Sequence, residues 1–202
     1  MANLLIATNN RGKMAEFGRL LDELPFDLHD LSSIGITDEI EETGETFAKN
    51  AAIKASGYAK MSGALTLADD SGLVIDYLKG EPGVRSARYA GEGASDGDRI
   101  EKVLSQMRDV ETDRRTARFV CVVALADTNG KVVHSTEGVC EGRIAFEPKG
   151  KNGFGYDPIF MPSGFDQTFA ELTSAVKNEI SHRALAVKKM IPYLQGFFHI
   201  LT

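Results

Sequence analysis

Near its N-terminus the chain reads Leu4-Leu5-Ile6-Ala7-Thr8-Asn9-Asn10-Arg11-Gly12-Lys13, an apolar run followed by a cluster of hydrogen-bond donors. Residues 3–8 have the pattern of a short buried strand, and the sequence up to Pro25 has the spacing of a helix. Free N–H groups and the positive end of the helix dipole favour an anion at such a junction. Thr8 to Lys13 is therefore a candidate phosphate site, although no Walker loop occurs in the chain. The alternative is an ordinary Asn-rich turn.

A second apolar run ends in Ala68-Asp69-Asp70-Ser71-Gly72, and Glu41-Glu42 precedes the next predicted helix. Magnesium usually binds one or two carboxylates together with substrate phosphates. Adjacent residues of an extended segment point in opposite directions, so one aspartate can face a site while the other makes a structural hydrogen bond. The alternative is that all four acids lie on the surface. A phosphate site beside an acidic metal site indicates chemistry on a nucleoside triphosphate or a similar phosphoester.

Composition sets broad limits. The 202 residues are expected to form a single domain, residues 1–202. A net charge of -6 argues against a nucleic-acid-binding protein. No signal-type segment or run of about 18 apolar residues is present, so we expect a cytoplasmic protein without a membrane partner. Cys121 and Cys140 lack metal-ligand spacing and are expected to be buried packing residues.

Strand-like and helix-like segments alternate, which predicts a mixed α/β fold with a long sheet. The expected elements after the first helix are a strand at 26–31, an acidic loop at 37–45, a helix at 46–61 capped by Thr46, strands at 64–69 and 73–78, a loop at 79–98, a helix capped by Asp96, a hairpin of 117–126 and 131–138, a strand at 158–160, and a last helix capped by Ser181 that Pro192 kinks or restarts.

Three further features are candidates for binding. Lys54 falls on the apolar stripe of the helix at 46–61, where it either snorkels to solvent or meets phosphate or a carboxylate. Gly153-Phe154-Gly155-Tyr156-Asp157-Pro158 offers an aromatic ring that could stack on a nucleobase, although such loops are also common turns. Ser181-His182-Arg183, with Lys177 upstream, places cations at a helix start; a bound anion would remove this conflict with the dipole, and a solvated helix start is the alternative.

Taken together, these segments resemble the inosine/xanthosine triphosphate pyrophosphatase family of house-cleaning enzymes. The resemblance covers roughly residues 3–195 and rests on motifs that occur in family order: Thr8-Asn9-Asn10-x-x-Lys13, Glu41-Glu42-Thr43-Gly44 with Phe47 and Asn50, Ala68-Asp69-Asp70-Ser71-Gly72-Leu73, Ser86-Ala87-Arg88-Tyr89, Gly153 to Pro158, Ala170-Glu171-Leu172, and Lys177 with Ser181-His182-Arg183. Many members carry Gly where this chain has Asn9, a residue that also tolerates a positive φ.

The resemblance implies an elongated mixed α/β fold with a long central sheet, two lobes, a substrate cleft between them, and a homodimer. It implies hydrolysis of dITP, ITP and XTP to the monophosphate and pyrophosphate, with Mg²⁺ as cofactor. Asp70 would be the catalytic or metal-binding carboxylate and Glu41 or Glu42 the second metal ligand. The implied substrate-binding residues are Thr8, Asn9, Asn10, Arg11, Gly12, Lys13, Ser71, Phe154, Gly155, Tyr156, Asp157, Lys177, His182 and Arg183, to which the stripe position adds Lys54.

Two alternative functions stay open at this point. One is a related pyrophosphatase that acts on modified pyrimidine or ordinary nucleotides. The other is a nucleotide-binding sensor without turnover, against which the presence of Lys13, Asp70 and Arg183 argues. Hypoxanthine and xanthine carry a 6-oxo acceptor where adenine carries an amine donor, so donors from His182, Arg183 or the backbone would favour the oxo bases. Guanine shares the 6-oxo group, and the sequence does not show how GTP is rejected.

Overall fold

The computed structural model describes residues 2–201, with side chains through residue 197. The fold is mixed α/β, with one six-stranded sheet in the order β2-β1-β3-β4-β5-β6. The strands are β1 (Ala2–Ile6), β2 (Phe26–Asp30), β3 (Thr66–Ile75), β4 (Thr116–Ala126), β5 (Val132–Ile144) and β6 (Phe160–Pro162). β1 pairs in parallel with both β2 and β3, and β5 pairs antiparallel with β6.

The first three helices lie between strands in the chain, as the alternating pattern predicted, and the last two follow β6. They are α1 (Arg11–Leu20), α2 (Phe47–Ser62), α3 (Asp96–Gln106), α4 (Ser174–Ile180) and α5 (His182–Leu201), with short 3-10 helices at η1 (Gly83–Arg88), η2 (Thr112–Arg114) and η3 (Asp157–Ile159). Thr46 caps α2 as predicted, because its side chain accepts a hydrogen bond from the Lys49 N–H. Within residues 2–201, none of the helices has the length and hydropathy needed to cross a bilayer.

The chain divides into two compact units. Unit 1 contains the residues through Asp70, Cys121–Gly138 and the segment from His182 onward; unit 2 contains Ser71–Val120 and Val139–Ser181. Strands β3, β4 and β5 therefore contribute residues to both units.

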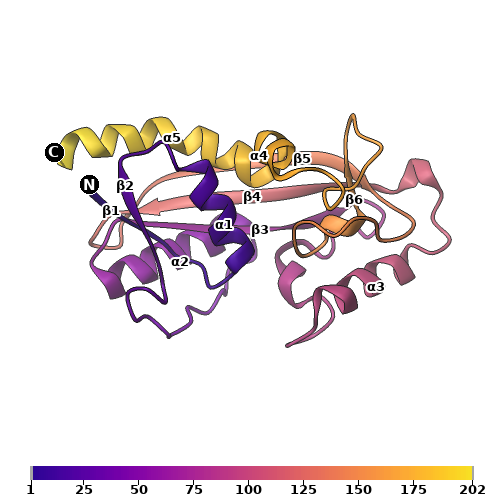
Figure 1. The fold of residues 1–202 in the computed structure, drawn as a ribbon. Helices are drawn as coiled ribbons and strands as arrows, with labels where there is room; N and C mark the ends of the chain where they lie inside the picture. The colour runs from indigo at the N-terminus through magenta and orange to yellow at the C-terminus, as the bar shows by residue number, and fades with distance from the viewer. Residues whose placement is uncertain (1, 202) are drawn as a thin grey trace. The chain divides into compact units, whose positions relative to one another are not determined.

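Unit 1 has a helix layer on each face of its strands (Figure 1). Alternate strand residues such as Leu4, Leu67 and Val123 pack with α1 and α5 in one buried cluster. Their neighbours, such as Ala68 and Val122, pack with α2 in the other. The period-two alternation of the strands thus assigns each side chain to one helix layer.

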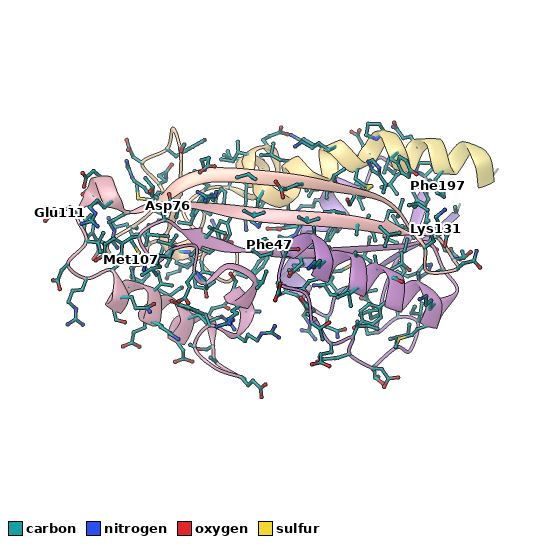
Figure 2. All side chains as sticks on the ribbon, turned by 180° about the vertical axis from the view of Figure 1, so that it is seen from behind. Phe47, Asp76, Met107, Glu111, Lys131 and Phe197 are labelled. Carbon is teal, nitrogen blue, oxygen red and sulfur yellow. The ribbon has the colours of Figure 1, made fainter. Side chains whose placement is uncertain are left out.

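Unit 2 has its own apolar core, built from β3 to β6, α3 and the segments around them. Phe160 belongs to this core, and the centroid of its ring lies 4.6 Å from that of Phe119 and 5.2 Å from that of Phe169. Arg115 is fully buried and donates to four backbone carbonyls, among them that of Met107, which is labelled at the end of α3 in Figure 2. This guanidinium satisfies carbonyls that the helix end leaves open.

The prediction for the acidic segment was wrong in one respect. Residues 64–69 and 73–78 were expected as two strands, with the aspartate pair at a strand end, but β3 runs without interruption from Thr66 to Ile75. Asp, Ser and Gly locally favour turns. Here each aspartate side chain has partners far away in the sequence, so the extended backbone is kept and both aspartates lie within the strand instead of at its end.

The predictions at helix ends had different outcomes. The cap of α3 was wrong, because Ser95, not Asp96, caps it and forms a capping box with Asp98. Ser181 directly precedes α5, which begins at His182, so it lies where the predicted cap of the last helix requires; it also ends α4, a short helix that the sequence analysis did not predict and that Thr173 caps. Pro192 lies inside α5, so the helix does not restart there, and the kink stays a prediction. Finally, η1 lies inside the expected loop at 79–98.

Candidate active site

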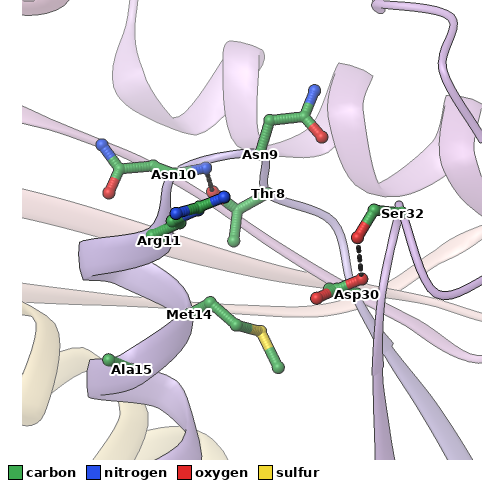
Figure 3. Close-up of a pocket in the computed structure, with 8 residues that line it drawn as sticks. All are labelled: Thr8, Asn9, Asn10, Arg11, Met14, Ala15, Asp30 and Ser32. Carbon is green, nitrogen blue, oxygen red and sulfur yellow. Dashed lines mark hydrogen bonds between the residues drawn. The ribbon is translucent and has the colours of Figure 1, made fainter.

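The donors predicted at the first strand–helix junction do gather there. Asn10 is the N-cap of α1, and its Oδ1 accepts the Lys13 N–H at 3.0 Å. Thr8 Oγ1 accepts the Asn10 N–H at 3.2 Å. Thr8, Asn9, Asn10 and Arg11 line a cavity of about 500 Å³, which Figure 3 shows together with its other lining residues, Met14, Ala15, Asp30 and Ser32. This end of α1 thus combines an open cavity with the helix dipole and a cationic side chain, an arrangement that suits a phosphate group.

Asp69 lies at the centre of a buried ion-pair chain in unit 1. Its Oδ2 is 3.0 Å from Lys13 Nζ and 3.0 Å from Arg183 Nη2. The Arg183 guanidinium also pairs with Glu16, a residue that the sequence analysis did not identify. The Arg183 side chain is only 1% exposed. Burial opposes ionisation of Asp69, but Lys13 and Arg183 overcome that effect and hold the pKa of its carboxyl far below the usual range.

Asp70 has a different environment on the α2 side. Its Oδ2 accepts a hydrogen bond from Asn50 Nδ2 at 3.1 Å, and its Oδ1 is 3.6 Å from Lys54 Nζ. Burial raises the pKa of the Asp70 carboxyl; Lys54 opposes the rise, and the negative charge of Glu42 adds to it. The pKa values of the two adjacent aspartates are therefore shifted in opposite directions. This arrangement is expected where one carboxylate stays ionised and the other exchanges a proton.

Lys54 connects Asp70 to Glu42. Its Nζ lies 3.2 Å from Glu42 Oε1, and its side chain is 12% exposed. Burial lowers the pKa of Lys54, but the carboxylates of Asp69, Asp70 and Glu42 raise it by more, so this amine stays charged. The prediction that Lys54 meets a carboxylate is confirmed, and the snorkelling alternative is wrong.

Asn50 organises the same region from the buried face of α2. Its Oδ1 accepts the Gly44 N–H at 2.7 Å while its Nδ2 donates to Asp70. One side chain thus ties the acidic loop before α2 to the β3 carboxylate. Asn50 was quoted for the resemblance, but its role could not be assigned because both partners are set by the tertiary fold.

The oxygens of Asp70 and Glu42 fit a hard divalent cation. No cluster of three or more His, Cys, Asp or Glu side chains placed for a metal occurs within the part of the chain that the structure describes. Magnesium commonly binds with only one or two carboxylates and keeps its other positions for water and phosphate oxygens. Two carboxylates would therefore hold such an ion only together with oxygens from water or a phosphate. Glu41 is exposed, and Glu42 is the acid that reaches Lys54.

The aromatic loop of unit 2 has a defined internal structure. Asp157 Oδ2 accepts the Phe154 N–H at 2.9 Å and the Lys177 ammonium at 2.5 Å. Lys177 Nζ also lies 4.9 Å from the centroid of the Phe154 ring. Gly153 has a φ of +76°, and a Cβ at this position would collide with the Asp157 carboxylate. Only glycine fits here.

The two aromatics of this loop differ in what they can do. Tyr156 is buried, and its hydroxyl donates to the Ser86 carbonyl at 2.8 Å. Phe154 is half-buried. Of the two rings, Phe154 is thus the one that is accessible to a base, while Tyr156 holds the loop against η1.

Comparison with known protein families identifies the family of this chain. The model of the Ham1 family matches residues 4–193. The chain belongs to the Ham1 family. It is 51% identical over 196 residues to a dITP/XTP pyrophosphatase of Bacillus subtilis (strain 168), a match that covers 97% of this chain and 98% of the relative. It is 48% identical over 195 residues to a dITP/XTP pyrophosphatase of Desulforamulus reducens, with 96% of each chain covered.

Solved Ham1 structures share the fold. A HAM1 protein from Coxiella burnetii superposes with a TM-score of 0.87 at 43% identity, covering 97% of this chain and 100% of that chain. The Staphylococcus aureus Ham1 protein gives a TM-score of 0.84 at 39% identity, covering 96% and 98%. These matches confirm the family and the mixed α/β fold predicted from the sequence.

The other predicted site residues of this Ham1 chain fall in three places. Gly12 is in the first turn of α1, and Ser71 is half-buried within β3. His182 is buried at the start of α5.

The conflict between Arg183 and the helix dipole is removed by Glu16 and Asp69 rather than by an outside anion. A direct contact of Arg183 with phosphate stays a prediction. Glu16 could have been found from its spacing, since it lies three residues after Lys13 on α1.

Proposed function

We propose that this chain hydrolyses dITP, ITP and XTP to the nucleoside monophosphate and pyrophosphate. Water would attack the α-phosphorus, and the bond between that phosphorus and the bridging oxygen of the leaving pyrophosphate would break. The single observation that carries the proposal is the placement of two adjacent carboxylates: Asp69 is ion-paired with Lys13 and Arg183, while Asp70 contacts Asn50 and Lys54 instead. The names of its Ham1 relatives support the substrate class.

The polar groups of unit 1 have distinct roles in this proposal. Lys13 and the N–H groups at the start of α1 bind the triphosphate. Asp70 accepts the proton of the attacking water, because a raised pKa improves a carboxylate as a base near neutral pH. Lys54 keeps Asp70 and Glu42 close together. If Asp70 serves instead as a metal ligand, Mg²⁺ bound by Asp70 and Glu42 would neutralise charge on the phosphate oxygens.

Recognition of the base is assigned to the remaining residues. Phe154 would stack on the purine, and Lys177, Asp157 and Tyr156 would keep its loop in place. A donor from His182 or from the backbone would bind the 6-oxo group. Arg183 is not assigned this role, because its guanidinium is already paired with two buried carboxylates. Leaving a donor facing the adenine amine costs about 1–3 kcal/mol per group, so two such contacts would give a preference of about a hundredfold or more over ATP.

Pyrophosphate release from each nucleotide, at low concentration with magnesium, tests this function. We expect dITP, ITP and XTP to be cleaved at least about a hundredfold better than ATP in kcat/KM. Comparable rates on ATP would indicate a general nucleotide pyrophosphatase, and a preference for dUTP-like or dTTP-like substrates would indicate a related pyrimidine enzyme. Binding of dITP without any release would indicate a sensor.

The resemblance to the family also motivates proposals about the setting of the reaction. We expect a homodimer, which light scattering on the purified chain would check. We also expect a cytoplasmic enzyme that acts on the free nucleotide pool, and fractionation of the producing cells would check this. The two-lobed cleft stays a prediction.

A further inference from the structure

The peptide planes on both sides of Phe154 Cα are each held by a carboxylate. The Phe154 N–H donates to Asp157 Oδ2 at 2.9 Å. The next N–H, that of Gly155, donates at 2.7 Å to Oδ2 of Asp96, a residue 59 positions earlier in the chain. Holding both planes restrains the φ and ψ of Phe154, and these angles restrict the side-chain rotamers and therefore the directions in which its ring can point.

Asp96 is not needed to cap its own helix. Ser95 accepts the Asp98 N–H, and Asp98 Oδ2 accepts the Ser95 N–H at 2.8 Å, so the capping box of α3 is complete without Asp96. As the first residue of α3, Asp96 therefore has its carboxylate available for a contact outside the helix.

The second oxygen of Asp96 is held in turn. Its Oδ1 pairs with Arg99 one turn later on α3. Nη1 of Arg99 donates to the carbonyls of Ala87 at 2.5 Å and Ala94 at 3.0 Å. The carboxylate plane is thus braced from two backbone segments of unit 2, and a braced acceptor limits the movement of the Gly155 N–H. The Asp96 side chain is nevertheless 44% exposed, which moderates the strength of the contact.

Gly155 explains why an outside anchor is useful. Its φ is +60°, and a Cβ built on it would meet nothing within 4 Å. Neighbouring atoms therefore do not crowd the backbone at this position, and glycine has more backbone freedom than any other residue. The Asp96 hydrogen bond supplies the restraint that a side chain would otherwise give.

We propose that Asp96 is a positioning residue, braced by Arg99, that orients Phe154 toward the purine base and so contributes to the choice of base. This role of Asp96 rests on the proposed function, because it is only there that Phe154 contacts the base. In the proposed function Asp96 itself contacts neither the phosphates nor the attacking water.

The test compares Asp96→Ala with Asp98→Ala in the full chain. Both changes remove an acid from the first turn of α3, but the hydrogen bonds of Asp98 all go to the cap residue Ser95 and none reaches Gly155. For Asp96→Ala we expect the KM for dITP to rise about 3- to 12-fold, because solvent exposure leaves roughly half of the free energy of a charge-assisted hydrogen bond, and we expect kcat to stay within about threefold. The ratio of kcat/KM for dITP over ATP should fall by a similar factor. Asp98→Ala should lower the melting temperature and leave KM and this ratio unchanged.

Amide exchange gives a readout that does not need substrate. The Gly155 amide should exchange at least about tenfold faster in Asp96→Ala than in the wild type, and Asp96→Asn, which keeps an acceptor oxygen, should restore part of the protection and part of the KM. Wild-type exchange at Gly155 in Asp96→Ala, or kinetics that match Asp98→Ala, would overturn the role of Asp96. If the wild type released no pyrophosphate from dITP, the proposed function would fail, while the exchange measurement would still decide whether Asp96 fixes the loop.

Discussion

Arg183 offers a direct test of the ion-pair chain in unit 1. Its guanidinium is buried between the carboxylates of Glu16 and Asp69. Arg183→Met removes the charge and keeps an unbranched apolar side chain. The change leaves Glu16 buried without this cation, and Asp69 keeps Lys13 at 3.0 Å. Removing one partner of a buried ion pair costs about 3–5 kcal/mol, because the remaining charge stays desolvated.

Urea denaturation would measure this loss from the shift of the midpoint at constant m-value. For a chain of this size about 1 kcal/mol corresponds to roughly 2–4 °C in melting temperature, so we expect a decrease of about 6–20 °C. Adding Glu16→Gln to Arg183→Met should recover part of the loss, because one buried charge is then neutralised. Because both substitutions change the same ion-pair network, their effects on the free energy of unfolding should be coupled by at least about 0.5 kcal/mol.

Arg143→Met is the matched control. Arg143 pairs with Asp166 at 3.4 Å, but its side chain is 45% exposed and Asp166 is fully exposed. Such surface pairs contribute about 0–1 kcal/mol. A cost for Arg183→Met below about 1 kcal/mol, no larger than that of Arg143→Met, would refute the reasoning that Arg183 neutralises two buried carboxylates.

Three further predictions concern catalysis and reactivity. Asp70→Asn should lower kcat at least about a hundredfold with an unchanged circular dichroism spectrum, and a near wild-type rate would remove Asp70 from the mechanism. Lys13→Ala should lower kcat/KM for dITP about 10- to 100-fold, and unchanged kinetics would place the phosphates elsewhere. Burial raises the pKa of the Cys121 thiol far above its usual range and that of Cys140 to about 12, so neither should react with Ellman's reagent at pH 8 until urea unfolds the chain.

Local patterns were sufficient for much of the fold. The helices α1 and α2 and the hairpin of β4 and β5 follow from periodicity and from caps and turns close in sequence, such as Thr46. β3 was predicted as two pieces because the Asp-Ser-Gly segment has a local turn preference. The contacts that override this preference are made by residues distant in the sequence; Arg183, for example, is 114 positions from Asp69. No local pattern contains that partner.

The candidate site shows the same division. The acids and cations could be predicted from residue types at strand and helix ends. Which aspartate carries which role depends on the three-dimensional neighbours that set their pKa values, namely Arg183 and Lys13 for Asp69, and Lys54 and Glu42 for Asp70. Asp96 was assigned only a capping role, because its contact with Gly155 spans 59 positions.

The alternation of β3 explains why two adjacent aspartates have opposite properties. Leu67 belongs to the cluster with α1 and α5, and Ala68 to the cluster with α2. Continuing this alternation places Asp69 toward the first layer, where it meets Lys13 and Arg183, and Asp70 toward the second, where it meets Asn50 and Lys54. One strand thus delivers one carboxylate to each helix layer.

The fixed charge of Asp69 has a consequence for the proposed phosphate site at the start of α1. Arg183, held by Glu16, keeps Asp69 ionised, and Asp69 in turn holds the Lys13 ammonium at 3.0 Å. An ammonium has three N–H donors, so Lys13 can keep this contact and still donate to a phosphate. The cation is therefore in place before substrate arrives, and a preorganised donor stabilises developing charge without reorganising during the reaction. Arg183 can thus affect turnover through Asp69 and Lys13 even without a contact of its own to phosphate.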